Sequence, residues 1–182
     1  MKKLIALLLV LMMTLSFAAC GGEEAAEGGD SGEITGEVFD AGAVKALIPK
    51  GWAVYPVNDM WSDEANATDP DQMQIVKGGT SEFDTLTKPT ITLIHYEPES
   101  MMTPTSDFYS EVVNLDPMTT GQLKWEGFSC KDLADEPLIV LWTTDAAGHG
   151  YQLNVRYKTS SGSFELTDRD VVAILESIAP SK

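Results

Sequence analysis

The chain has 182 residues, a length that suits one domain with short appendages. It carries 12 lysine and arginine residues against 28 aspartate and glutamate residues, a net charge of −16 at pH 7. This charge argues against nucleic-acid binding, because phosphate contacts need clustered lysine and arginine. The two cysteines make no disulfide framework, and by themselves they are too few for a four-ligand zinc site.

The first residues have the order of a secretory signal. Lys2 and Lys3 precede the apolar run 4–13, and small residues follow before a boundary. A positive start, a short apolar stretch and small residues are typical of a signal peptide. The run is too short for a membrane span, which needs about 20 apolar residues.

The boundary falls at Cys20, which follows Ala18-Ala19 and precedes two glycines. This motif resembles the lipobox of bacterial lipoproteins, with Phe17 where Leu is usual. The resemblance implies that residues 1–19 are removed as a lipoprotein signal peptide and that Cys20 is acylated with palmitate-type chains. Each buried CH2 of an acyl chain contributes about 0.8 kcal/mol, so two or three chains hold a domain on a membrane. An ordinary signal peptide cleaved after Ala19 is the alternative.

An acidic tether is expected to follow the anchor. Segment 21–33 carries five acids, no base and no residue larger than Glu. Such a segment cannot bury enough apolar surface to offset its ordering entropy, which predicts disorder. We therefore expect the lipidated cysteine and a disordered tether over 20–37, and a single domain over 38–182.

Alternating polar and apolar residues predict strands in the first half of the domain. Residues 44–48 and 52–57 alternate on either side of a Pro-Lys-Gly turn, which predicts a β-hairpin. Two further segments predict strands: 72–77 and 90–96.

The spacing then changes to that of a helix. Phe108, Val112 and Leu115 stand at positions i, i+4 and i+7, which predicts an amphipathic helix over 107–115. Three further strands are expected: 122–131, 138–144 and 149–158. The middle strand is apolar on both faces and is expected to be central. The last alternates cleanly, so one face is expected in the core and the other only partly covered.

A terminal helix is expected between Thr167, as its N-cap, and Pro180. Val171, Leu175 and Ile178 give it an apolar stripe. Strands and helices occur in blocks, which favours an α+β domain with a mainly antiparallel sheet.

Two motifs carry a family resemblance. The Ile-Pro-Lys-Gly-Trp corner at 48–52 and the Ile-Leu-Glu-Ser-Ile helix end at 174–178 resemble small secreted proteins of the Mog1/PsbP-like fold. The resemblance spans about Val38 to Pro180. It implies a three-layer α/β/α sandwich around the antiparallel sheet, and it implies no shared catalytic centre.

The chain has none of the common catalytic signatures. It contains no Gly-x-Ser-x-Gly, Walker A, Gly-x-Gly-x-x-Gly, His-Glu-x-x-His or Cys-x-x-Cys motif. His95 is expected at a core or boundary position of a strand, and His149 is expected exposed in a turn. Cys130 is interpreted as buried and inert, because a reactive thiol needs nearby positive charge or a helix N-terminus.

One acidic loop, 58–71, holds the candidate ligand-binding residues. They are Trp61, Asp63, Glu64, Asp69 and Asp71. A tryptophan with flanking carboxylates can stack on a sugar and bind its hydroxyls, or contact a protein partner. The carboxylates also suit a hard cation such as Ca²⁺, although their spacing is not that of an EF-hand. The simplest interpretation is a solvated loop with Trp61 packed on the sheet, and no cofactor is expected.

The sequence therefore predicts a non-enzymatic, monomeric binding or interaction module, anchored through Cys20 to the cell surface or the periplasmic face of a membrane. Its partner is a protein or a small molecule. One alternative is a small extracytoplasmic hydrolase or thiol enzyme, which requires at least two of His95, His149 and Cys130 to meet in one cleft. The other alternative is a divalent-cation-binding module.

Overall fold

The computed structural model describes residues 34–181. The predicted signal peptide, Cys20 and the tether up to residue 33 lie outside the described residues. The first strand, β1, begins at Gly36, so the last two residues of the expected tether belong to the domain.

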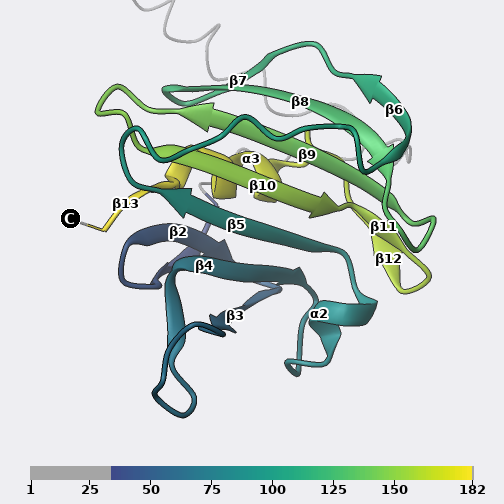
Figure 1. Ribbon diagram of the computed structural model, residues 1–182. Coiled ribbons are helices and arrows are strands. Elements are labelled where there is room, and N and C mark those ends of the chain that lie inside the picture. The colour runs from purple at the N-terminus through teal and green to yellow at the C-terminus, as the bar shows by residue number, and fades with distance from the viewer. Residues whose placement is uncertain (1–33, 182) are drawn as a thin grey trace, which may run out of the picture. The chain divides into compact units, whose positions relative to one another are not determined.

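Most of the domain is one antiparallel eight-stranded sheet (Figure 1). Seven strands follow one another in the order β3-β4-β5-β10-β9-β8-β6, and β7 pairs with β8. Their bounds are β3 Trp52–Asn58, β4 Thr68–Lys77, β5 Thr90–Tyr96, β6 Ser110–Asn114, β7 Met118–Thr120, β8 Leu123–Lys131, β9 Pro137–Thr144 and β10 Gly150–Arg156. The expected mainly antiparallel sheet is confirmed.

Smaller elements complete the domain. β1 (Gly36–Asp40), β2 (Val44–Pro49) and β13 (Ala179–Pro180) form a three-stranded antiparallel sheet, and β11 (Lys158–Thr159) pairs with β12 (Gly162–Ser163). The helices of the described part are α2 (Asp84–Thr87) and α3 (Arg169–Ser177).

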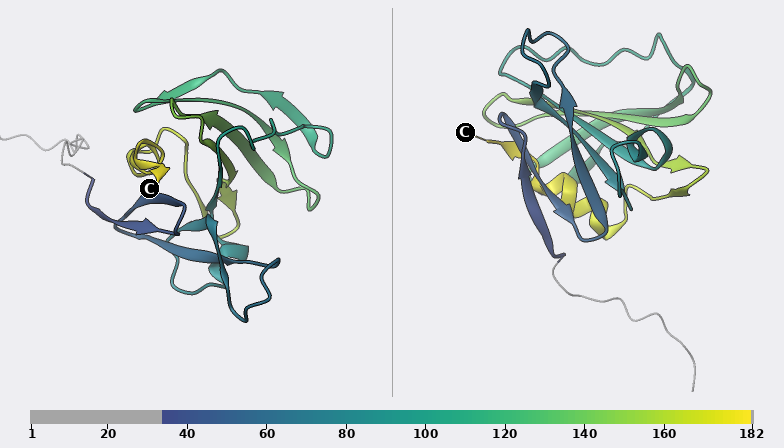
Figure 2. Two further views of the ribbon diagram at one scale, coloured as in Figure 1. Left: turned by 60° about the vertical axis from the view of Figure 1, so that its left-hand side comes forward. Right: turned by 90° about the horizontal axis from the view of Figure 1, so that it is seen from below.

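The main core lies between the large sheet, α3 and the small sheet (Figure 2). We call the face of the large sheet that packs on α3 and β2 the inner face, and the opposite one the outer face. Trp125 and Leu153 are fully buried on the inner face, against Val171 and Ile174 of α3. The indole N–H of Trp125 donates to Thr120 Oγ1 at 2.8 Å. The remaining members of this cluster come from β2, β3, β4, β5, β9 and β10.

The expected three-layer sandwich is not what the described residues form. α3 and the small sheet cover the inner face, whereas the helix that the described residues place on the outer face is the four-residue α2, at one end. The helix predicted over 107–115 does not form, so that prediction is wrong. The fold of the described part is therefore richer in β structure than the resemblance implies.

The segment expected to be that helix forms edge strand β6 instead. Phe108 is 74% exposed and Val112 37% exposed, so their helical spacing does not mark a buried stripe. Adjacent β-branched residues favour a strand, and pairing with β8 satisfies backbone groups on one side of β6. A register shift between Ser110 and Val113, with Glu111 at φ 52°, bends the strand.

The strands around the Pro-Lys-Gly turn do form, but the predicted hairpin between them is wrong. β2 pairs with β1 and β13, whereas β3 pairs with β4. The chain therefore leaves the small sheet at Pro49 and enters the large sheet at Trp52. Long-range partners, and not the short turn, decide which strands pair.

The strands expected over 72–77, 90–96, 122–131, 138–144 and 149–158 are confirmed as β4, β5, β8, β9 and β10. The terminal helix is also confirmed, but its N-cap is Asp168 in place of Thr167, and the Asp168 side chain makes no capping hydrogen bond. β9 lies between β10 and β8, with Val140 and Leu141 buried on its two faces.

Candidate functional site

The centre of the outer face is a band of uncharged polar side chains. Gln74 of β4, Thr92 of β5 and Asn154 of β10 lie directly opposite one another in register, and all three are half-buried. The next row contains Gln152 opposite Ile94. Because β-strand residues alternate between faces, these side chains point away from the inner face, where Leu93 and Leu153 are buried.

Part of this band is a hydrogen-bonded ladder. The Tyr96 hydroxyl donates to Gln152 Oε1 at 3.2 Å, and Gln152 Nε2 donates to Asn154 Oδ1 at 3.0 Å. Burial raises the pKa of Tyr96, so its hydroxyl stays protonated and remains a donor near neutral pH. The ladder fixes the orientation of both amides.

The rest of the band has no protein partner. The side chains of Gln74 and Thr92 make no hydrogen bond to any of residues 34–181. Within that range no buried side-chain nitrogen or oxygen lacks a partner, so these polar atoms contact solvent. An open amide offers two donor hydrogens and an acceptor oxygen, which makes this row available for a ligand.

Aromatic rings border the band on β8 and β9. Trp142 lies opposite Gln152, and its ring centroid is 6.0 Å from that of Phe128. Phe128 in turn packs at 5.6 Å on Tyr109, which precedes β6. The outer face thus combines hydrogen-bonding amides with adjacent aromatic surface, the combination found in many small-molecule sites.

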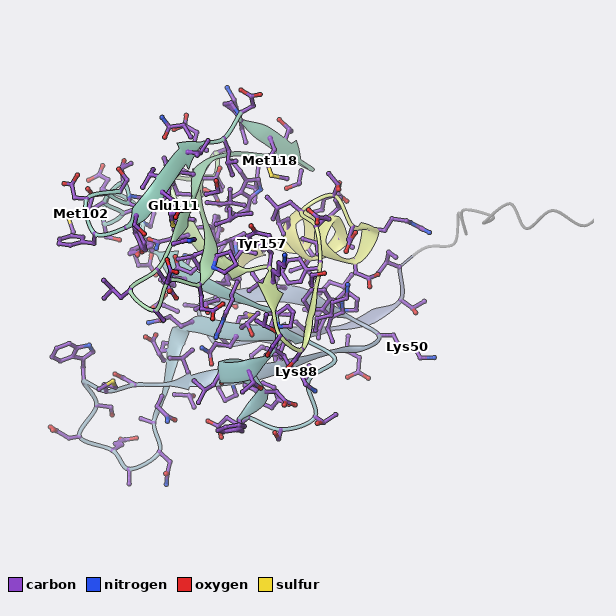
Figure 3. The ribbon with its side chains drawn as sticks, turned by 90° about the vertical axis from the view of Figure 1, so that its right-hand side faces the viewer. Lys50, Lys88, Met102, Glu111, Met118 and Tyr157 are labelled. Carbon is purple, nitrogen blue, oxygen red and sulfur yellow. The ribbon has the colours of Figure 1, made fainter. Side chains whose placement is uncertain are left out.

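Two connections extend on the outer side of the sheet. The β3–β4 loop and the 97–109 segment both project away from α3 (Figure 2). Met102, on the 97–109 segment, is 83% exposed and points away from the body of the domain (Figure 3). At the end of β10, the Arg156 guanidinium donates to the carbonyls of Thr85 and Leu86 in α2 at 2.6 and 2.8 Å.

The residues predicted to bind a ligand in the acidic loop fall into two groups. Trp61 is 96% exposed in the loop that joins β3 to β4, and Asp63 and Glu64 are exposed near it. The expectation that Trp61 packs on the sheet is therefore wrong. Asp69 and Asp71 lie in β4, where Asp69 accepts from the Asp71 N–H and from Gln72 Nε2.

The two histidines meet on the inner side of the sheet. His95 Nδ1 lies 2.7 Å from Asp71 Oδ1, and His95 Nε2 lies 3.0 Å from His149 Nδ1. His95 is 3% exposed, so its predicted core position is confirmed. The prediction that His149 is an exposed turn residue is wrong, because it is half-buried and bonded to His95.

The cysteine of the domain lies apart from this pair. Cys130 is a buried free thiol, as predicted, and it packs with Phe128 and Val140 on the outer face. Burial, and to a smaller extent the charge of Asp132, raise the pKa of Cys130, which disfavours the thiolate. The thiol and the imidazoles therefore lie on opposite faces of the sheet and share no centre.

No group of three or more His, Cys, Asp or Glu side chains in residues 34–181 is arranged to hold a metal ion. The cation-binding alternative thus gains no ligand set from the described part of the chain. Asp59 instead accepts from the Trp61 N–H at 2.9 Å, and Asp69 accepts from the Asp71 N–H at 2.9 Å.

Sequence reasoning missed the band on the outer face. The alternation of β10 predicted a partly covered face with Gln152 and Asn154 on it, but it did not show which strands lie beside β10. The available signal was the pair of amides, Gln152 and Asn154, on the face of β10 that was predicted to be only partly covered.

Comparison with known proteins gives no family for this chain. No protein-family model matches it, and no curated protein matches it significantly. In the part that the structure describes, no helix is long and apolar enough to cross a membrane.

Proposed function

We propose that the protein is a lipid-anchored, extracytoplasmic binding module whose outer sheet face binds its ligand. The observation that carries this proposal is the row Gln74–Thr92–Asn154, in which the first two side chains have no hydrogen-bond partner among the described residues. The lipobox at Cys20 and the acidic tether support the location.

The chemistry of the outer face favours a polyhydroxylated ligand such as an envelope glycan. Amides donate and accept at once, as sugar hydroxyls do, and they carry no charge that would select an ionic ligand. The nearby ring of Trp142 offers a flat apolar surface for the C–H face of a sugar. Trp61, on a loop that extends to the same side of the sheet, is a second stacking surface in this proposal (Figure 2).

Sedimentation with insoluble polysaccharides tests the proposal. The full chain in detergent is mixed with peptidoglycan, chitin or xylan, and the bound fraction is measured against polymer concentration. We expect at least one polymer to retain the protein. The double variant Gln74→Ala/Asn154→Ala should then bind about tenfold more weakly, since each lost hydrogen bond contributes about 0.5–1.5 kcal/mol.

Gln122→Ala is the matched control, because Gln122 is an exposed amide in the turn between β7 and β8. This variant should bind as the wild type does. Retention by none of the three polymers, or equal binding by the double variant, would overturn the proposal.

One observation favours a second candidate, an extracytoplasmic hydrolase. His95 and His149 converge, and Asp71 orients His95, which is the arrangement of a carboxylate-supported base. Release of soluble sugar from the same polymers tests this candidate. It requires hydrolysis by the wild type and its loss in His149→Ala.

We also propose that the domain is related by descent to proteins of the Mog1/PsbP-like fold. The antiparallel sheet and the packing of α3 on β2 support it. In this proposal the domain is a divergent member in which strand β6 replaces a helix.

A further inference from the structure

A hydrogen-bonded triad of titratable side chains, Asp71, His95 and His149, joins three strands of the large sheet. Asp71 belongs to β4, His95 to β5, and His149 directly precedes β10. The His95 side chain is 1% exposed and the Asp71 side chain 40% exposed, so the triad runs from solvent into the core. The triad is separate from the proposed ligand site, which lies on the other face of the sheet.

The hydrogen-bond partners fix where the protons lie. The Asp71 carboxylate can only accept, so His95 Nδ1 donates to it, and His95 Nε2 of a neutral ring must accept from His149 Nδ1. One additional proton on the pair still leaves a single hydrogen between the two rings. A second additional proton places N–H against N–H at a separation of 3.0 Å, which removes the bond and adds charge repulsion.

The groups around the pair do not compensate for that second proton. Asp145 accepts from the His149 backbone N–H at 3.0 Å and from the Tyr151 hydroxyl at 3.1 Å. The Tyr151 ring packs on His95 with centroids 5.7 Å apart, and burial and Asp145 raise its pKa, so it stays neutral. Asp71 is thus the carboxylate in direct contact with an imidazole of the pair.

The two hydrogen bonds of the triad hold the β9–β10 loop, residues 145–149, against the sheet. The other side of this loop is packed by the start of the 97–109 segment. Gly148 lies against Pro98, and a side chain at Gly150 would collide with Met101. A movement of His149 therefore changes the support of the residues at 98–101.

We propose that Asp71, His95 and His149 form a pH-sensitive clasp. Near neutral pH the clasp fixes the β9–β10 loop to β4 and β5. Doubly protonating the histidine pair opens it and loosens the loop together with residues 98–101. Histidine side chains change charge between about pH 5 and 8. A domain outside the cytoplasm experiences this pH range when its surroundings become acidic.

Amide hydrogen exchange on the full chain in detergent tests the clasp. After correction for intrinsic rates, exchange at 145–150 should rise about fivefold or more between pH 7 and pH 5, relative to β8 in the same molecule. His149→Asn should abolish this step, because an asparagine amide can turn to give His95 either a donor or an acceptor. Asp63→Asn, at an exposed carboxylate, should keep it.

A second measurement on the unmodified chain guards against misfolding of the variant. The chain has two histidines, so its imidazole NMR signals all come from this pair. The clasp requires a hydrogen-bonded N–H between the two rings at pH 7 and the loss of that signal at pH 5. Absence of this signal at pH 7, an unchanged exchange rate at pH 5, or the same acid step in a folded His149→Asn variant would overturn the proposal.

Discussion

His95 and His149 place Nε2 and Nδ1 3.0 Å apart although 54 residues separate them in the sequence. The contact arises because β5 and β10 are neighbours, with His95 opposite Tyr151. The enzyme alternative required two of three named residues to meet in one cleft. These two residues meet, but His95 is 3% exposed, so their contact lies in the core. The third, Cys130, lies on the opposite face, so a thiol enzyme that uses a histidine of this pair has no support in the geometry.

Cys130 is expected to be unreactive in the folded protein. In the variant Cys20→Ser it is the chain's remaining thiol. Because burial raises its pKa, alkylation by iodoacetamide at pH 7 should be about tenfold or more slower in buffer than in urea. Mass spectrometry of the labelled protein measures both rates. Equal alkylation rates in the two solvents would show that Cys130 is reactive in the folded protein and could act as a nucleophile.

Asp84 is expected to contribute stability that acid removes. Its carboxylate accepts from the Thr80 N–H at 2.7 Å, from Ser81, and from Lys88, and these contacts lower its pKa to about 2 from an ordinary 3.8. A lowered pKa in the folded state stabilises the fold above the unfolded value, and this stabilisation disappears as the pH falls through the folded value.

Asp84→Asn should therefore be less stable than the wild type at pH 7. The difference in free energy of unfolding should shrink as the pH falls from about 4 toward 2. Urea unfolding at several pH values measures this difference. A difference of the same size at pH 7 and at pH 2.5 would contradict the role given to the ionised carboxylate.

Leu153 and Trp61 should differ sharply in their contribution to stability. Leu153 is fully buried on the inner face, so Leu153→Ala should lower the free energy of unfolding by about 2–5 kcal/mol. Trp61 is 96% exposed, so Trp61→Ala should change it by no more than about 0.5 kcal/mol. Denaturant titration of both variants gives these values, and a large loss for Trp61→Ala would show that the loop packs on the domain.

Cys20 should decide where the protein is found. Cys20→Ser removes the proposed acylation site and should move the protein from the membrane fraction to the soluble fraction. Cys130→Ala is the control and should leave the distribution unchanged. Membrane association of Cys20→Ser equal to that of the wild type would refute the lipid anchor.

Local patterns predicted much of the fold. The alternation in β8 and β10 and the apolar stripe of α3 are visible in the sequence because each element buries one face against the core. The same reasoning failed at β6, where Phe108 and Val112 have helical spacing but are exposed, so the pattern reflected no burial. Three apolar residues at intervals of four and three also fit a strand that contains a bulge.

Pairing between strands that are far apart in the chain could not be predicted. β2 pairs with β13, and Ala179 lies opposite Lys45, a relationship that no local turn specifies. The histidine contact and the outer row depend on the same unknown order of strands. Gln74, Thr92 and Asn154 come from three strands, and only the order β4-β5-β10 brings them together.

The central claim is that the outer face is the binding surface, and side-chain amide NMR tests it most directly. The NH2 signals of Gln74 and Asn154 are recorded while soluble fragments of the retained polysaccharide are added, with Gln122 as the internal reference. We predict that the signals of Gln74 and Asn154 shift with a common saturation curve while the Gln122 signal stays constant. Binding that leaves both signals unmoved would contradict the account.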